Sequence, residues 1–188
     1  ELAGKAKYER TREFADMFLF SSFTGLRVSD LVSLKWSEVD MDKGMISHMQ
    51  YKGHTRNAKM LYIPLNETSR EILERWKDKH EEFVFGLLPS GYDLSDEAAF
   101  KKMKGAKTRT INQSLRSIGD KMGLPFNLHI HLGRHTFAMM TLNGGVDIKT
   151  TSALLGHAST MVTERVYATL LPNTIAEIVG DKLNVRLD

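Results

Sequence analysis

Cysteine is absent from this sequence of 188 residues. Its absence excludes a disulfide framework, an iron–sulfur cluster and a zinc site with thiolate ligands, and it fits a reducing cytoplasm. The chain also lacks any apolar run near the ~20 residues that a membrane-spanning helix requires, and its first residues lack the apolar centre of a secretory signal. We therefore expect a globular cytoplasmic protein with no membrane partner.

Positive charge is only in small excess, with 26 basic against 23 acidic residues, which is too little to diagnose a nucleic-acid partner. The distribution of charge is more informative. Residues 43–66 contain no acid, and residues 101–121 contain seven basic residues against the single acid Asp120. Either run alone is typical of a solvated surface, but the two together favour a polyanionic partner. The basic residues of the two runs are Lys43, Lys52, Arg56 and Lys59, and Lys101, Lys102, Lys104, Lys107, Arg109, Arg116 and Lys121.

The spacing of apolar residues predicts one domain of the α+β class, mostly helical with a small antiparallel β-hairpin or sheet. The hairpin strands are expected at 45–51 and 59–65, and Pro64 should end the second strand. Two capping-box patterns, Thr110-x-x-Gln113 and Thr174-x-x-Glu177, predict the starts of two further helices. Helical spacing occurs at 9–23, from 28 onward, and at 67–80, 137–142, 148–155 and 162–170, and a long loop is expected at 86–95.

Two histidines and an arginine share the segment His131-Leu-Gly-Arg134-His135. On a helix these three residues are neighbours, because one turn takes 3.6 residues. The i, i+4 spacing of His131 and His135 is that of a helical zinc pair, so a helical metalloenzyme is one alternative. Leu132 stands where the zinc motif has glutamate, and we expect no metal. Histidines that only satisfy backbone groups at a helix start are another interpretation.

Arg27 directly follows the Thr24-Gly25 break and opens a helix, where backbone N–H groups and the helix dipole favour an anion. Arg27 is therefore a candidate phosphate ligand. Further along the chain, Gly156-His157 ends another helix, and Tyr167 follows. A tyrosine in such a position is more often part of a core than a catalytic group.

Taken together, these segments resemble the catalytic domain of the tyrosine recombinases, the site-specific recombinases of the lambda-integrase type. The resemblance covers most of the chain, and within the family the chain looks closest to integrases of bacterial mobile elements such as conjugative transposons. Its marks follow the family's order: Thr-Gly-Leu-Arg27-x-Ser-Asp-Leu, a Lys-Gly hairpin leading into Tyr-Ile-Pro64-Leu, His131-x-x-Arg134-His-Thr-Phe-Ala, Leu-Gly-His157, and Tyr167.

The resemblance implies a role for each matching residue. Arg27 and Arg134 would clamp the scissile phosphate, and Tyr167 would attack it. His131 would accept the proton of the tyrosine, and His157 would hydrogen-bond a phosphate oxygen.

Three further residues have roles by the same resemblance. Lys52 is the better match to the hairpin lysine, which would protonate the departing DNA oxygen. Lys59 is its rival, because the stretch 53–59 is longer than the family's usual short turn. Asp30 stands where the family has an acid that orients the arginine, and His135 would be structural.

The activity implied is site-specific recombination or integration: DNA strands are cut and rejoined through a 3′-phosphotyrosyl bond, without metal, ATP or another cofactor. Two alternatives remain, a nicking and closing enzyme like the type IB topoisomerases and a DNA-binding regulator without catalysis. The implied partners are double-stranded DNA and further copies of the chain, in a homotetramer on DNA, with a monomer expected for the isolated catalytic part.

The resemblance also bears on domain organisation. The whole chain, residues 1–188, would be a catalytic domain, and we expect the family's N-terminal DNA-clamping domain to be absent from it. Residues 173–188 have the apolar spacing of a further helix. That helix would either pack on its own domain or be passed to a neighbouring protomer.

Overall fold

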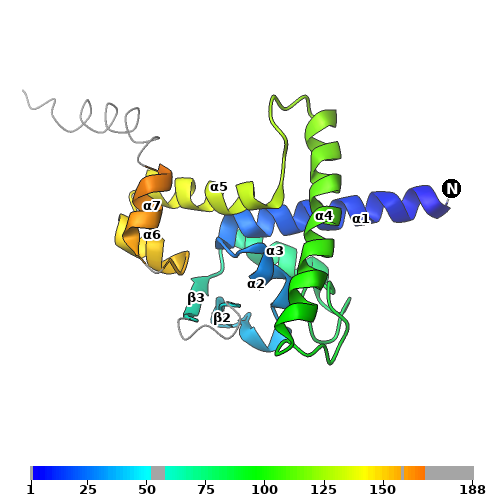
Figure 1. Ribbon diagram of the computed structural model, residues 1–188, viewed down its shortest axis with the longest axis horizontal. Coiled ribbons are helices and arrows are strands. Elements are labelled where there is room, and N and C mark those ends of the chain that lie inside the picture. The colour runs from blue at the N-terminus through cyan, green and yellow to red at the C-terminus, as the bar shows by residue number, and fades with distance from the viewer. Residues whose placement is uncertain (1, 52–57, 158, 168–188) are drawn as a thin grey trace, which may run out of the picture.

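The computed structural model describes residues 2–51, 58–157 and 159–167, with backbone alone for residues 2–8, 162 and 165–167. Its described part is mostly helical with one small antiparallel sheet, as the sequence predicts (Figure 1). The helices are α1 (Leu2–Thr24), α2 (Val28–Ser33), α3 (Glu67–Trp76), α4 (Glu97–Lys121), α5 (Ile130–Asn143), α6 (Ile148–Leu154) and α7 (Thr160–Tyr167), with a 3₁₀ turn η1 (Trp36–Glu38). The strands are β1 (Val39–Asp40), β2 (Met45–Met49) and β3 (Met60–Pro64).

The sheet has the order β1-β2-β3 with antiparallel neighbours. Ile46 of β2 pairs with Val39 on one side and Ile63 on the other. Burial alternates along both long strands because successive side chains of a strand point to opposite faces. The predicted hairpin is confirmed, and Pro64 does end β3. The short strand β1 was not predicted, because its two residues are too few to show an alternating pattern.

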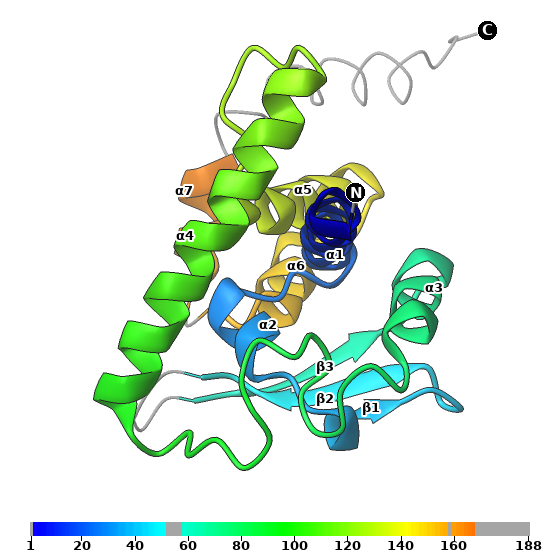
Figure 2. The ribbon, with the colours of Figure 1, turned by 90° about the vertical axis from the view of Figure 1, so that its right-hand side faces the viewer.

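Helix α1 is the centre of the helical part. Figure 2 shows it nearly end-on, with α4 on one side, α3 on the other and the sheet below. Phe14, Met17 and Phe20 of α1 are buried, and each large apolar side chain removed from water stabilises the fold by roughly 1.5–3 kcal/mol. Trp76 at the end of α3 is also buried, and its indole N–H donates to Asp16 Oδ2 at 3.2 Å.

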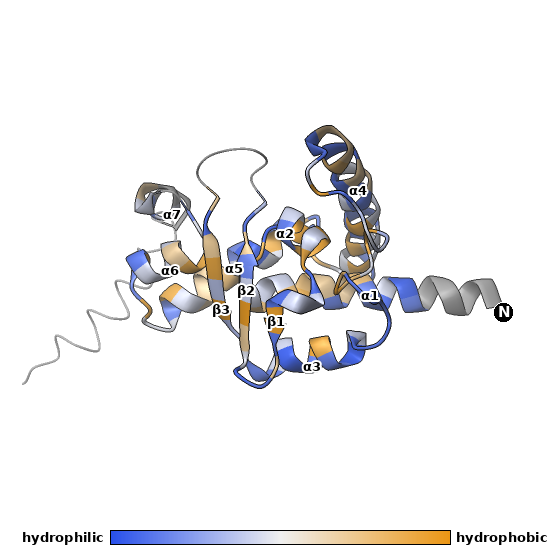
Figure 3. Ribbon diagram, turned by 90° about the horizontal axis from the view of Figure 1, so that it is seen from below, coloured by the Kyte–Doolittle hydropathy of each residue, from blue (hydrophilic) through white to orange (hydrophobic). Residues whose placement is uncertain are grey.

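Helix α4 corrects one prediction. The capping box at Thr110 was expected to open a helix, but α4 begins at Glu97, after Asp96, whose carboxylate accepts the backbone N–H of Ala99 at 2.9 Å. Thr110 lies in the helix interior, where its hydroxyl donates to the carbonyl of Ala106. The aspartate cap and an apolar face that extends through Phe100 and beyond Thr110 outweigh a local capping pattern. Figure 3 shows both polar and apolar positions along α4.

Other boundaries differ more modestly from the prediction. Helix α5 begins at Ile130 rather than near 137, because the side chain of Asn112 on α4 accepts the N–H of Ile130 at 2.9 Å. Helix α3 ends at Trp76 rather than His80, and Asp78 adopts a φ of 64°. The expected helix at Thr174 lies outside the described residues. Within the described part, no helix combines the length and apolarity needed to cross a membrane.

Candidate active site

Arg27 precedes the first residue of α2, just after the turn at Gly25. Gly25 has a φ of +70°, which an L-residue rarely adopts, and a Cβ there would collide with Phe137. The backbone N–H of Arg27 donates to Asp30 Oδ2 at 3.2 Å, which caps the helix start. The guanidinium Nη2 of Arg27 donates to the carbonyl of Gly156 at 3.4 Å, and Nη1 is buried without a hydrogen-bond partner among the described residues.

Arg134 projects from α5 and is 7% exposed. Its Nη1 donates to the carbonyl of Gly25 at 2.6 Å, and its Nη2 donates to the carbonyl of Leu155 at 2.7 Å. One guanidinium therefore joins the turn before Arg27 to the end of α6. A planar guanidinium with several fixed donors suits this bridging position, which the single point charge of a lysine could not reproduce.

The carbonyls at the end of α6 receive three cations. Leu155 accepts from Arg134, Gly156 accepts from Arg27, and His157 accepts from Lys59 Nζ at 2.9 Å. Free carbonyls at a helix C-terminus carry partial negative charge, so they attract basic side chains. Residues distant in the sequence thus meet here, Arg27 and Arg134 among them.

Gln50 is a buried residue of the same region that the sequence did not single out. Its Nε2 lies 3.2 Å from the carbonyl of Gly156 and 3.4 Å from that of Leu155. Gly156 has a φ of +60°, and a Cβ at this position would collide with the Gln50 side chain. The end of α6 is therefore packed directly against the hairpin.

His131 and His135 lie one turn apart on α5, with ring centroids 5.8 Å apart and edges meeting faces. Although His131 is exposed overall, the protein removes water from its ring, and the positive charges of His135, Arg134 and Arg27 act in the same direction, so the pKa of His131 lies below 6.5. Its imidazole is then neutral near pH 7 and able to accept a proton. Among the described residues, no group of three or more His, Asp or Glu side chains could hold a metal ion.

His157 links the end of α6 to α7, because its Nδ1 lies 2.8 Å from the hydroxyl of Thr163. Thr163 is buried on α7, whose last residue is Tyr167. The helix that carries the predicted nucleophile is therefore connected to His157, which directly follows the carbonyl groups that hold the two arginines. The side chain of Tyr167 and the whole of Lys52 lie outside the described residues.

Asp30, which the resemblance places as an acid beside the arginine, lies in a cluster of ionisable groups beneath the hairpin whose other members, His48 and Glu38, the sequence did not single out. Asp30 is fully buried, and its Oδ1 accepts the backbone N–H of Tyr51 at 3.1 Å. His48 is buried between two acids, with Nδ1 3.0 Å from Glu38 Oε1 and Nε2 3.6 Å from Asp30 Oδ1. A histidine at an inward position of a strand, next to the inward Ile46, is the signal that could have revealed the cluster.

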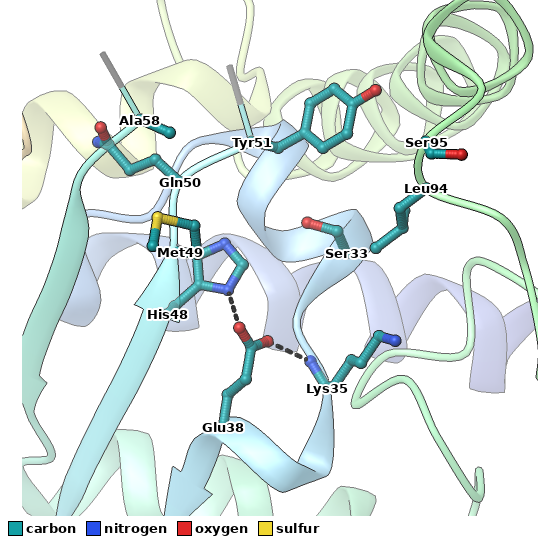
Figure 4. A pocket seen from close by; sticks show the side chains of 10 residues that line it. All are labelled: Ser33, Lys35, Glu38, His48, Met49, Gln50, Tyr51, Ala58, Leu94 and Ser95. Carbon is teal, nitrogen blue, oxygen red and sulfur yellow. Dashed lines mark hydrogen bonds and ion pairs between the residues drawn. The ribbon is translucent and has the colours of Figure 1, made fainter. Parts of the chain in front are cut away.

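Figure 4 shows His48 and Glu38 in the wall of a pocket of about 350 Å³, between β2 and the loop at Leu94. Neither arginine lines this pocket. The arginines instead lie where the backbone carbonyls at the end of α6 hold them.

Residues 4–173 match the family model described as the phage integrase family. Tyrosine recombinase XerC of Bacillus pumilus is 31% identical over 143 residues, which cover 75% of this chain and 44% of that protein. Tyrosine recombinase XerC of Bacillus subtilis is 30% identical over 158 residues, which cover 80% of this chain and 48% of that protein. The chain thus spans about half the length of the curated relatives it matches.

Solved structures show the same fold. The crystal structure of XerA recombinase has a TM-score of 0.61 at 24% identity, and the match covers 91% of this chain and 63% of that one. The structure of the Tn1549 transposon integrase with transposon right end DNA has a TM-score of 0.58 at 20% identity. The match covers 81% of this chain and 53% of that one. This chain therefore belongs to the phage integrase family and has the fold of a tyrosine recombinase catalytic domain.

Proposed function

We propose that this chain is the catalytic part of a site-specific DNA recombinase or integrase, which cuts and rejoins strands through a 3′-phosphotyrosyl bond to Tyr167. The observation that carries the proposal is the meeting of Arg27 and Arg134 at the end of α6, next to the residue that contacts the tyrosine-bearing helix. Family membership supports it, because the curated relatives are tyrosine recombinases.

The two arginines would stabilise the negative charge that develops on the phosphate during the reaction. Attack on a phosphodiester places additional negative charge on the non-bridging oxygens, and two guanidinium groups can absorb it while staying charged at any working pH. Arg27 has a donor that no described residue uses, whereas its other terminal nitrogen is held by Gly156. Arg134 is fixed by two carbonyls, so the clamp is organised before DNA arrives.

Proton transfer completes the proposed step. The Tyr167 oxygen forms a bond to phosphorus while its proton passes to neutral His131, and the bond from phosphorus to the DNA 5′-oxygen breaks. The departing oxygen takes a proton from a lysine, for which Lys52 and Lys59 are the candidates. Attack by a 5′-hydroxyl of another strand then reverses the step and exchanges the strands, with no need for metal or ATP.

Double-stranded DNA is the proposed partner. The XerH recombinase structure is bound to difH substrate, and the Tn1549 integrase structure holds transposon DNA. In this proposal, both basic runs of this chain lie along the phosphate backbone of the DNA. Assembly into a homotetramer on DNA belongs to the same proposal, with residues 173–188 as the exchanged segment.

Replacing Tyr167 by Phe tests the nucleophile. A pool of nicked suicide duplexes, with randomised positions around the nick, is incubated with the chain at micromolar concentration, and covalent adducts are separated by denaturing electrophoresis. The unaltered chain should give adducts, whose sequencing identifies the preferred duplex, and Tyr167→Phe should give none while retaining DNA binding. Adducts should also form in EDTA.

Two results would contradict this function: an adduct mapped to another residue in the Phe variant, or a strict requirement for a divalent metal. Strand transfer to a second DNA molecule separates a recombinase from a nicking and closing enzyme. The absence of any adduct from the unaltered chain would favour a DNA-binding regulator.

A further inference from the structure

Buried charge accumulates beneath the hairpin, at His48, Asp30 and Glu38. Asp30 is 0% exposed and His48 is 2% exposed. The ion pairs of the described part give Asp30 one cation, His48, at 3.6 Å, and place Glu38 on the other ring nitrogen at 3.0 Å. Lys35 also lines the adjacent pocket, but its ammonium pairs with Glu82 at 2.7 Å. His48 therefore lies between two acids on two different elements.

Asp30 connects two parts of the site through backbone N–H groups. One carboxylate oxygen accepts from Arg27, and the other accepts from Tyr51, the residue before Lys52. A carboxylate that accepts two N–H bonds must remain ionised to accept both fully, and a fully buried carboxylate without a counter-charge tends instead to take up a proton. The placement of Arg27 and of the hairpin thus depends on a positive charge near Asp30.

We propose that His48 is a positioning residue: its imidazolium compensates the buried negative charge of Asp30, and Asp30 then fixes both the start of the Arg27 helix and the backbone at Tyr51, which follows β2. This inference rests on the proposed function for its catalytic consequence, but not for its structural part. Burial disfavours the charged ring, yet the nearby negative charges of Asp30 and Glu38 and the hydrogen bond to Glu38 outweigh burial and raise the pKa of His48 to about 9. The ring is therefore charged at neutral pH.

The first test needs no DNA. In His48→Gln, the backbone amides of Arg27 and Tyr51 should lose protection against hydrogen exchange by about tenfold or more, because Asp30 becomes a weaker acceptor. His48→Lys restores a cation and should recover that protection. Ile63→Ala, which removes apolar volume from the neighbouring strand without altering charge, is the control for general loss of stability. It should lower the protection of the two amides by no more than it lowers that of the β2 amides.

The second test uses the duplex that the unaltered chain captures most efficiently. His48→Gln should cleave it at least tenfold more slowly at unchanged DNA affinity, His48→Lys should recover most of that rate, and Ile63→Ala should cleave normally below its unfolding temperature. Between pH 7 and 10, the rate of the unaltered chain should fall relative to His48→Lys, because lysine keeps its proton to higher pH.

The two tests separate the two ideas. If the unaltered chain captures no duplex, the proposed function fails, while amide exchange still decides the role of His48. The positioning role is wrong if Gln preserves the protection of both amides, if Ile63→Ala removes it equally, or if a folded Lys variant recovers neither protection nor rate.

Discussion

At the scale of single residues, the site depends on backbone carbonyls as much as on side chains. Arg27 and Arg134 are held by the carbonyls of Gly156 and Leu155, which are free because α6 stops there. Gly156 makes this stop possible with its positive φ and with the absence of a side chain against Gln50. A single glycine therefore sets the position of the groups that would bind the phosphate.

Replacing Gly156 by Ala should destabilise the fold and slow DNA cleavage. Gly145→Ala is the matched control, because Gly145 also has a positive φ, +83°, but nothing lies within 4 Å of a Cβ there. We expect about 1–2 kcal/mol for the control from backbone strain, and roughly 1–3 kcal/mol more for Gly156→Ala from overlap with Gln50. Chemical denaturation measures both. Equal losses at the two positions would show that the Gln50 contact does not matter.

The charge of His48 should make stability depend on pH. The folded pKa of about 9 lies above the ordinary value of 6.5, so the stabilisation is complete below pH 6.5 and is lost as pH rises to about 9. The shift corresponds to a loss on the order of 3 kcal/mol across that range. Urea denaturation at pH 6, 7.5 and 9 should show the decline, and His48→Gln should show a flatter profile. A parallel decline in both proteins would assign the effect to other groups.

At the scale of elements, α4 combines a structural face with a charged face. Phe100, Ile111 and Leu115 are buried, whereas Lys102, Arg109 and Arg116 are exposed at intervals of seven residues, which places them along one side of the helix. Lys104 and Lys107 are half-buried beside the core. Part of the basic run of the sequence therefore forms a stripe along α4.

Neutralising two members of this stripe, Lys102→Gln with Arg109→Gln, should weaken binding to all DNA sequences alike. Each lost phosphate contact should reduce the slope of log affinity against log salt by about 0.9. Lys77→Gln is the control, because Lys77 follows α3, which lies on the other side of α1 from α4 (Figure 2). Fluorescence anisotropy over a range of salt concentrations measures the slopes. An unchanged slope for the double variant would identify the stripe as an ordinary solvated surface.

At the scale of the whole molecule, the site is assembled from both halves of the chain. Arg27 comes from the first part, and Arg134 and His157 come from the last. Helix α5 lies along α1 (Figure 1). Helix α7, which ends at Tyr167, is joined to the end of α6 by the contact of His157 with Thr163. The segment that follows α7 is in a position along the chain to influence the tyrosine, although it lies outside the described residues.

Deleting residues 173–188 should reduce strand exchange and DNA-bound oligomers more than DNA binding or the stability of the domain. The reason is that Ile175, Ile178 and Val179 would form an apolar face that a neighbouring protomer covers in the proposed tetramer. Native gels and light scattering on the captured duplex measure the assembly. If the shortened chain unfolds, or if it assembles as well as the full chain, the segment belongs to its own domain and the exchange proposal fails.

The class of fold, the hairpin and the family motifs could be predicted without coordinates, because each depends on local spacing or on residue identity. Alternation over a few residues is enough to predict β2 and β3. A proline such as Pro64 tends to end a strand whatever its surroundings. The same locality explains the failure at Thr110: a capping pattern was present, but Asp96 and the apolar face of α4 decided where the helix begins.

How the candidate residues meet depends instead on the packing of the elements. No spacing in the sequence reveals that Arg27, Arg134 and Lys59 all reach the carbonyls of residues 155–157, or that His48 bridges Asp30 and Glu38. Such contacts join residues up to 129 positions apart. They depend on where a helix ends in space and on which polar groups are left without water, and both are settled only when the elements pack together.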